Sequence, residues 1–367
     1  LTDIDFSYCT NISHEALKSL LTLYKLQSVK LSNTQADSEW FLSLLENCSR
    51  IKHISLQRCG DLGNLDKIKK KYISPTVEVL NLSYTSLAHT VVASFQKVFP
   101  NLKQLNIAGS LVDDPTLQAV LPNLPHLESL NISNCGGIST LTLSSANQEI
   151  PNLKQLYVNG CVHLRSLSVV STVLTTIDFQ QCPELVQVAF TLPLIHKLDF
   201  ESLRNISNIN LVCRSLKTLS FNGCSKIKDH TLTQLIATCK HLKELVLRNC
   251  VGITREGVAT LTQLESLVLQ QLFNVEEIEL ESKMLTSLTL IDIPFTEALL
   301  QCPSLERVTM ERSPKADCAM KHSSKPAKGS RLFPMGDEWL PTLLANSPAI
   351  TYLNLSDSPV TNASLHG

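Results

Sequence analysis

The sequence predicts an α/β solenoid, in which successive turns of the chain each add one short strand to a parallel sheet. Three observations support this prediction. An apolar six-residue pattern recurs along nearly the whole chain, the recurrences are closely and almost evenly spaced, and the segments between them change from helical to strand-like patterns. Repetition at such a period is typical of chains in which each unit buries its apolar face against its neighbours.

The recurring pattern is L-x-x-L-x-L, with Ile, Val, Phe or Met replacing Leu at some positions. Alternate side chains of a strand face opposite sides, so each hexad is predicted to be a strand with its apolar side chains turned inward. The pattern is that of a leucine-rich-repeat solenoid, a horseshoe with a parallel concave sheet of about 15 strands. The hexads start at Leu1, Leu26, Ile51, Val77, Leu102, Leu127, Leu153, Leu174, Ile195, Leu216, Leu242, Leu264, Leu285, Leu305 and Ile350.

The segments that return from one hexad to the next predict a convex side of mixed helices and short strands. The first six steps are 25 or 26 residues long and look helical, as in 14–24 and 89–99, where the apolar residues share one helical face. Between Leu153 and Leu216 the step falls to 21 residues. Each of these short steps contains an extra hexad, which predicts returning strands that start at Leu164, Leu185 and Ile206. Two longer steps follow, and then another extra hexad predicts a returning strand that starts at Val275.

The domain prediction is one leucine-rich-repeat array over residues 1–367, and we expect it to be a fragment of a longer protein because neither end shows a polar capping element. The last step is irregular and contains a basic loop inserted at 313–333, followed by a helix at 337–345. The loop could hold an acidic partner or a localisation signal, although a disordered segment without such a role is the simpler interpretation. Its basic residues are Lys315, Lys321, Lys325, Lys328 and Arg331.

The 12 cysteines include no Cys-x-x-Cys pair and fit a reduced scaffold. Eleven recur at fixed places, and Cys318 alone lies in the basic loop. A catalytic thiol needs a base and an electropositive setting, and zinc needs a tetrahedral cage, so we expect no catalytic residue, no metal and no cofactor. Seven follow a hexad by three residues (Cys9, Cys59, Cys135, Cys161, Cys182, Cys224 and Cys250), and four precede the next hexad (Cys48, Cys213, Cys239 and Cys302).

The balance of charge limits the classes of partner. Lysine plus arginine number 32 and aspartate plus glutamate number 33, a net charge of −1. Nucleic-acid binders usually carry a basic excess, so we expect no nucleic acid as ligand. No apolar run has the ~18 residues of a membrane helix, so we expect no membrane contact and a cytoplasmic or nuclear location.

The longer motif around the cysteines is more specific than the leucines. The stretches CTNISHEAL at Cys9, CSKIKDHTL at Cys224 and CVGITREGV at Cys250 resemble the cysteine-containing repeats of F-box/LRR proteins. The mixture of long helical turns with short turns such as QCPELVQVAF is similar to a subgroup that includes plant F-box/LRR-repeat protein 15. The chain departs from the pattern at the basic insertion and in the signature aspartate, which occurs only as Asp229.

The resemblance implies a binding module rather than an enzyme: the substrate-recognition repeats of an F-box-type (SCF) ubiquitin ligase. In that family the F-box binds the Skp adaptor of a cullin ligase, and no F-box is found in these residues. The alternative is a scaffold, an immune sensor or a pathogen effector whose repeats bind a host protein. A GTPase-stimulating repeat protein fits less well, because the Ran-activating family has longer repeats with Asn in the turn.

A protein ligand is expected on the concave face, where tyrosine and arginine are the usual anchors of an interface. Tyrosines supply aromatic candidates, arginines line the strand exits, and three carboxylates form a candidate acidic patch. A merely solvated face remains the alternative for each cluster. The candidates are Tyr8, Arg58, Tyr84, Tyr157, Asp178, Asp199, Glu201, Arg248 and Arg312.

Overall fold

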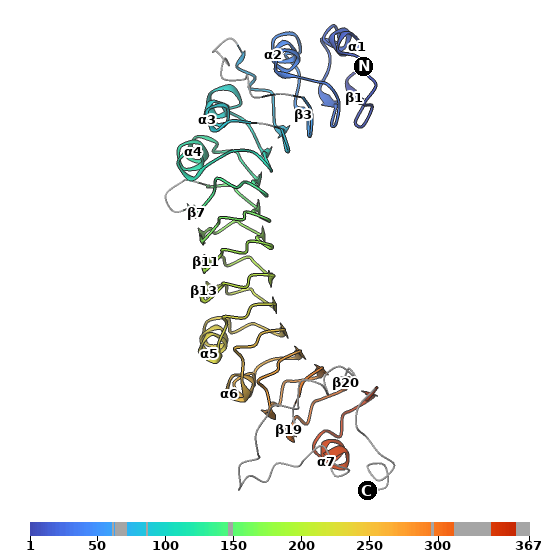
Figure 1. Cartoon of the computed structure of the whole chain (residues 1–367), viewed down its shortest axis with the longest axis vertical. Helices are drawn as coiled ribbons and strands as arrows, with labels where there is room; N and C mark the ends of the chain where they lie inside the picture. The colour runs from blue at the N-terminus through green and yellow to red at the C-terminus, as the bar shows by residue number, and fades with distance from the viewer. Residues whose placement is uncertain are drawn as a thin grey trace. The chain divides into compact units, whose positions relative to one another are not determined.

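The computed structural model describes residues 1–60, 62, 72–85, 87–145, 150–294, 297–311 and 339–356. The chain forms two compact units. Unit 1 comprises Leu1–Leu185 with Ala189–Leu194, and unit 2 comprises Val186–Val188 with Ile195–Gly367. Each unit is a stack of turns that contribute one strand to a long parallel sheet and then return along its other side (Figure 1). The predicted loop at 313–333 lies outside the described residues.

All fifteen hexads form strands, which confirms the predicted pattern. Unit 1 holds an eight-stranded sheet and unit 2 a seven-stranded sheet. The first contains β1 (Asp3–Asp5), β2 (Ser28–Lys30), β3 (His53–Ser55), β4 (Val79–Asn81), β5 (Gln104–Asn106), β6 (Ser129–Asn131), β8 (Gln155–Tyr157) and β10 (Thr176–Asp178). The second contains β12 (Lys197–Glu201), β14 (Thr218–Asn222), β15 (Glu244–Arg248), β16 (Ser266–Gln270), β18 (Ser287–Ile291), β20 (Arg307–Glu311) and β21 (Tyr352–Asn354).

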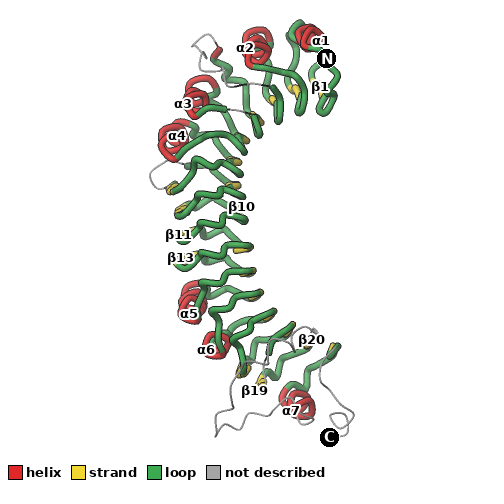
Figure 2. The backbone as a smooth tube through the Cα atoms, in the orientation of Figure 1, coloured by secondary structure: helices red, strands yellow, loops and turns green. Residues whose placement is uncertain are grey.

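The returning segments change along the chain from helices to strands, to helices and to strands again, as predicted (Figure 2). The helices are α1 (His14–Leu20), α2 (Ser38–Asn47), α3 (His89–Val98), α4 (Asp114–Val120) with a 3-10 turn at Leu121–Asn123, α5 (Asp229–Thr238), α6 (Arg255–Ala259) and α7 (Trp339–Asn346). The strands are β7 (Thr140–Ser144), β9 (Ser166–Val170), β11 (Gln187–Thr191), β13 (Asn208–Val212), β17 (Glu277–Glu281) and β19 (Glu297–Gln301).

One prediction about the returns is wrong. The sixth return was expected to be helical, and it is strand β7, which pairs in parallel with β9. The stretch Thr140–Ser144 alternates exposed threonines with buried Leu141 and Leu143, a two-residue period that a helix cannot bury on one face. The β-branched threonines favour the strand as well.

The core of each unit is a stack of leucines, with phenylalanines where a turn needs more volume. In unit 1, the rings of Phe95 and Phe99 lie 5.6 Å apart beneath the helical returns. In the shorter turns, which lack a helix, Phe179 of the sheet side meets Phe190 of the return side edge-on at 5.4 Å. All four rings are fully buried. Burial of this apolar area is the main stabilising term, because a single turn has no core of its own.

Asparagines end several strands of unit 1 by capping the turn that follows. The side-chain Oδ1 of Asn81, Asn106 and Asn131 accepts a hydrogen bond from the backbone N–H two residues later, at 3.1, 3.1 and 3.0 Å. Asn and Asp favour this local bond over continued strand pairing. The carboxylate of Asp5 makes the same bond to the N–H of Ser7 at 3.0 Å. Hydrogen bonds from the Ser7 side chain, and then from this N–H, hold the pKa of Asp5 below its ordinary value.

Replacing a capping asparagine should therefore destabilise the sheet end. We expect Asn106→Ala to lower the free energy of unfolding by about 1 kcal/mol, since a half-buried backbone N–H loses its acceptor. Urea unfolding monitored by circular dichroism measures the change. Gln104→Ala, on the same strand but with an exposed side chain, is the control. Equal midpoints for the two variants would contradict the capping role.

Candidate protein-interaction surfaces

In thirteen turns a left-handed residue follows the hexad at the same place, seven positions after the hexad begins; after the last two hexads this position lies outside the described residues. Its positive φ, from 51° to 72°, bends the chain out of the sheet at the edge where the strands end, here called the exit edge. Six of the thirteen are Asn or Gly, the residues that adopt this conformation most readily. They are Tyr8, Asn33, Arg58, Tyr84, Gly109, Asn134, Gly160, Gln181, Ser202, Gly223, Asn249, Gln271 and Asp292.

The left-handed residues keep neighbouring turns in register. Within unit 1, the backbone N–H of Arg58 donates to Ser83 at 2.9 Å, and that of Tyr84 donates to Ala108 at 2.6 Å. The parallel ladder therefore continues past the strand end, and the side chain of each left-handed residue starts from a fixed backbone. The left-handed conformation at this position was not predicted from the sequence, although Asn or Gly recurs immediately before several of the cysteines.

The cysteine that follows the left-handed residue ties one turn to the preceding one. The thiols of Cys161 and Cys182 each donate to a backbone carbonyl of the preceding turn at 3.3 Å, and the thiol of Cys224 does so at 3.0 Å. Burial raises the pKa of Cys161 and Cys224 to about 12, so both are neutral thiols at physiological pH. A buried neutral thiol is a poor nucleophile, which agrees with a structural role.

Among the eleven described cysteines none forms a disulfide, and nine are buried. Cys59 is half-buried and Cys9, in the first turn, is exposed. The part of the chain that the structure describes contains no cluster of His, Cys, Asp and Glu suited to a metal ion. No described helix has the length and apolar character that crossing a membrane requires.

Each long sheet has one face that no returning segment covers, here called its open face, and the two open faces differ in chemistry. In unit 1 the central row runs through Asn81, Asn106, Asn131 and Tyr157, all half-buried on directly paired positions. In unit 2 it runs through the half-buried Val246, Val268, Thr289 and Thr309, again on paired positions. The open face of unit 1 thus offers amides, and that of unit 2 a stripe of β-branched side chains.

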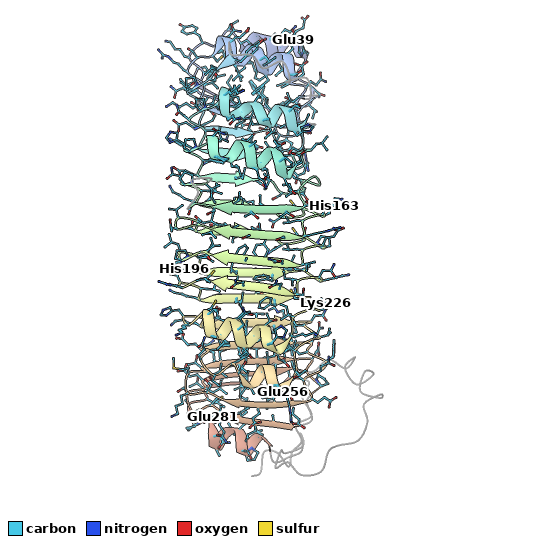
Figure 3. The ribbon with its side chains drawn as sticks, turned by 90° about the vertical axis from the view of Figure 1, so that its left-hand side faces the viewer. Glu39, His163, His196, Lys226, Glu256 and Glu281 are labelled. Atoms are coloured by element: carbon cyan, nitrogen blue, oxygen red, sulfur yellow. The ribbon has the colours of Figure 1, made fainter. Side chains whose placement is uncertain are left out.

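In each unit, the side opposite the open face carries the helices and returning strands. Figure 3 looks onto this side, where Glu39 comes from α2, Glu256 from α6 and Glu281 from β17. Much of its charge is already used locally. Arg255, for example, forms ion pairs with both Glu256 and Glu277.

The predicted site residues occupy three kinds of position. Tyr8, Arg58 and Tyr84 are left-handed residues on the exit edge of unit 1. Tyr157 and Asp178 end strands of unit 1, where Asp178 accepts a hydrogen bond from Asn159 at 2.6 Å. Asp199, Glu201 and Arg248 lie on strands of unit 2, and Arg312 lies outside the described residues.

The acidic patch proposed from the sequence draws on both units. Asp178 belongs to unit 1, whereas Asp199 and Glu201 belong to unit 2, two residues apart on one face of β12. The Oδ1 atom of Asp199 is buried and has no hydrogen-bond partner among the described residues. A buried carboxylate oxygen without a donor is costly, which makes this position the most unusual of the three.

Comparison with known families agrees with this architecture. Residues 71–222 match the family model described as "FBD-associated F-box protein At5g56370, LRR repeats", and residues 238–261 match a general leucine-rich-repeat model. The chain is built of leucine-rich repeats. The helices and short strands of the returning side are the variable part of these repeats, and the hexads are their constant part.

Two curated proteins share sequence similarity with the repeats. The F-box protein MAX2 homolog A of Petunia hybrida is 22% identical over 272 residues, which cover 62% of this chain and 36% of that protein. A putative RNA-binding protein of Caenorhabditis elegans is 23% identical over 342 residues, which cover 86% of this chain and 44% of that protein. The chain therefore spans less than half the length of either relative.

Several solved structures are similar to this chain at low sequence identity. A chain of the Toll–Spatzle complex of Drosophila is 15% identical with a TM-score of 0.46, covering 99% of this chain and 49% of its own. A chain of the yeast Rad7–Elc1 complex is 16% identical with a TM-score of 0.37, covering 85% of each.

The burial of the thiols makes a prediction about their reactivity. In the folded chain, iodoacetamide at pH 8 should label Cys9 and leave Cys161, Cys182, Cys224 and Cys250 unmodified, because the buried four have raised pKa values and little thiolate. Peptide mapping by mass spectrometry measures the labelling, and urea-unfolded protein is the control in which all five react. Rapid labelling of any of these four cysteines in the folded protein would contradict a purely structural role for that thiol.

A close inter-turn contact on the exit edge lies at Gly109, whose φ is 71°. A Cβ there would lie 2.7 Å from Cδ1 of Tyr84, so Gly109→Ala must displace the ring as well as strain the backbone. We expect a loss of about 1–2 kcal/mol in the free energy of unfolding. In a Tyr84→Ala background the clash is gone, so the same substitution should cost less, as urea unfolding of the four-member cycle would show. Additive costs would mean that the ring does not pack on Gly109.

Proposed function

We propose that this chain is a protein-binding module that holds the substrate of an F-box-type (SCF) ubiquitin ligase. The supporting observation is that a model of repeats from an F-box protein matches residues 71–222, while a relative described as an F-box protein covers 62% of the chain. In this proposal the Skp adaptor and the cullin are reached only through an F-box, and the repeats themselves contact the substrate.

The open faces support binding of a protein rather than catalysis. Unit 2 presents the row Val246, Val268, Thr289 and Thr309, and half-buried β-branched side chains in a continuous row suit the buried centre of a protein interface. Arg248, exposed at the end of β15 beside this row, supplies a residue type that is common among interface anchors. The net charge of −1 favours a protein over a nucleic acid as the ligand.

A second candidate function is a scaffold, an immune sensor or a pathogen effector, with the repeats binding a host protein that is not degraded. This alternative uses the same surfaces, so the geometry does not separate it from the first. The proteins that accompany the full-length protein distinguish the two. A cytoplasmic or nuclear location is part of the ligase proposal.

Affinity purification of the full-length protein from cell lysate, analysed by mass spectrometry, tests the proposal. We expect the Skp adaptor and a cullin among the recovered proteins, with the substrate among the remainder and enriched when the proteasome is inhibited. Recovery of an abundant partner without adaptor or cullin would reject the ligase function and favour the scaffold. Recovery of RNA in place of protein would reject both.

The acidic residues of β12 give a prediction for the same partner. Asp199→Asn with Glu201→Lys should weaken partner binding by about tenfold or more, since a reversed charge at a complementary interface is repulsive. Titration of the purified partner by calorimetry measures the effect. Glu279→Lys, an exposed acid on the return side of the same unit, is the matched control. Unchanged affinity in the double variant would remove the acidic residues from the binding surface.

A further inference from the structure

The exit edge of unit 1 carries a group of four exposed side chains, three of which contact one another, and the candidates chosen from the sequence include only two of the four. Arg58, Tyr84 and Asn134 are left-handed residues of three different turns. Leu111 lies two residues after Gly109, in the turn between that of Tyr84 and that of Asn134. These four residues are here called the exit strip. Tyr84 exposes 43% of its surface and Leu111 69%, and Arg58 and Asn134 are exposed.

The exit strip is ordered by contacts between turns. The Arg58 guanidinium lies over the Tyr84 ring, 5.2 Å from its centroid. The amide Nδ2 of Asn134, fifty residues further along the chain, donates to the Tyr84 hydroxyl at 2.9 Å. Gly109 leaves room for the ring between these two partners. The tyrosine is therefore held from both sides, and its hydroxyl hydrogen remains available to donate.

The backbone beneath these side chains is fixed as well. The N–H groups of Arg58, Tyr84 and Asn134 each donate to a carbonyl of the next turn, at 2.9, 2.6 and 2.7 Å. A bulky side chain on a left-handed residue has few alternative positions, because both the backbone and its neighbours constrain it. A partner that binds a surface already ordered in this way loses less conformational entropy on binding.

The charge of the exit strip selects the partner. Among the described residues the Arg58 guanidinium has no hydrogen bond and no ion pair, only the tyrosine ring beneath it. The eight left-handed residues of unit 1 include this one cation and no acid. The carboxylates at the starts of nearby helices accept hydrogen bonds from backbone N–H groups instead of pairing with Arg58. Asp37 accepts from Trp40, Asp113 from Thr116 and Asp114 from Ser139.

We propose that the exit strip is a docking surface for an extended protein segment that carries a carboxylate beside an apolar side chain. The carboxylate accepts a forked pair of hydrogen bonds from Arg58 and one from the Tyr84 hydroxyl, and the apolar side chain packs on Leu111. Planar guanidinium groups match carboxylates in two parallel bonds, and stacking on an aromatic ring holds the fork in place. This inference rests on the proposed protein-binding function and adds the chemistry of the partner and a surface outside the open faces.

A selection from a displayed library of random short peptides against the full chain tests the proposal without knowledge of the natural partner. We expect the enriched peptides to contain Asp or Glu next to a large apolar residue. For a synthetic peptide of the enriched sequence, Arg58→Ala should lower the affinity at least about tenfold. Arg58→Lys should restore only part of it, because lysine keeps the charge and loses the fork. Tyr84→Phe, which keeps the ring and removes the hydroxyl, should cost about fivefold.

The matched control is Arg50→Ala, which removes an exposed arginine of the same unit just ahead of β3, at the opposite end of that strand from Arg58. Its affinity for the peptide should equal that of the unchanged chain. Equal losses for Arg50→Ala and Arg58→Ala, enrichment of basic peptides, or no enriched peptide at all would overturn the proposal. So would tighter binding of an oligouridylate probe than of any peptide. None of these outcomes bears on recovery of the Skp adaptor and cullin, so the ligase proposal fails or stands separately.

Discussion

The structure depends on one constraint, which is that a turn of about 21 to 26 residues cannot bury its own apolar face. A hexad strand becomes stable only when the strands on either side pair with it and its leucines meet those of the neighbouring turns. Every other regularity follows from the need to keep adjacent turns in register. The returning segments are free to be helix or strand because register is set on the sheet side, by pairs such as Leu80 with Leu105.

Register is maintained beyond the strands by two consecutive positions. The left-handed residue continues the hydrogen-bond ladder to the next turn, and the cysteine after it donates to a carbonyl of the preceding turn, as at Gly160 and Cys161. Where both are present, as in this turn, they connect it to the next turn and to the preceding one. This arrangement accounts for the recurring cysteines of the described turns, since a small thiol fits a buried position and still makes one weak hydrogen bond.

A scaffold of this kind separates stability from recognition. The inward positions of the hexads hold Leu, Ile, Val, Phe and one Met, whereas the open face and the exit edge carry varied side chains. Unit 1 uses this freedom for amides such as Asn106 and for the ring of Tyr84, and unit 2 uses it for the valines at 246 and 268. Under the proposed function, the binding chemistry would reside in side chains that lie outside the apolar core.

The fold class, the fifteen strands of the sheets, the returning strands from Leu164 to Val275 and the scaffold positions of the cysteines could be predicted from the amino-acid sequence. These are local patterns, because the alternation of inward and outward side chains leaves a two-residue period in any strand. The sequence also supplied Arg58 and Tyr84 as candidates by residue type alone. The stacking of Arg58 on the Tyr84 ring and the hydrogen bond from Asn134 to the Tyr84 hydroxyl are visible only in the folded chain. Those contacts join turns 26 and 50 residues apart, and they depend on register and side-chain conformation, which no local pattern encodes.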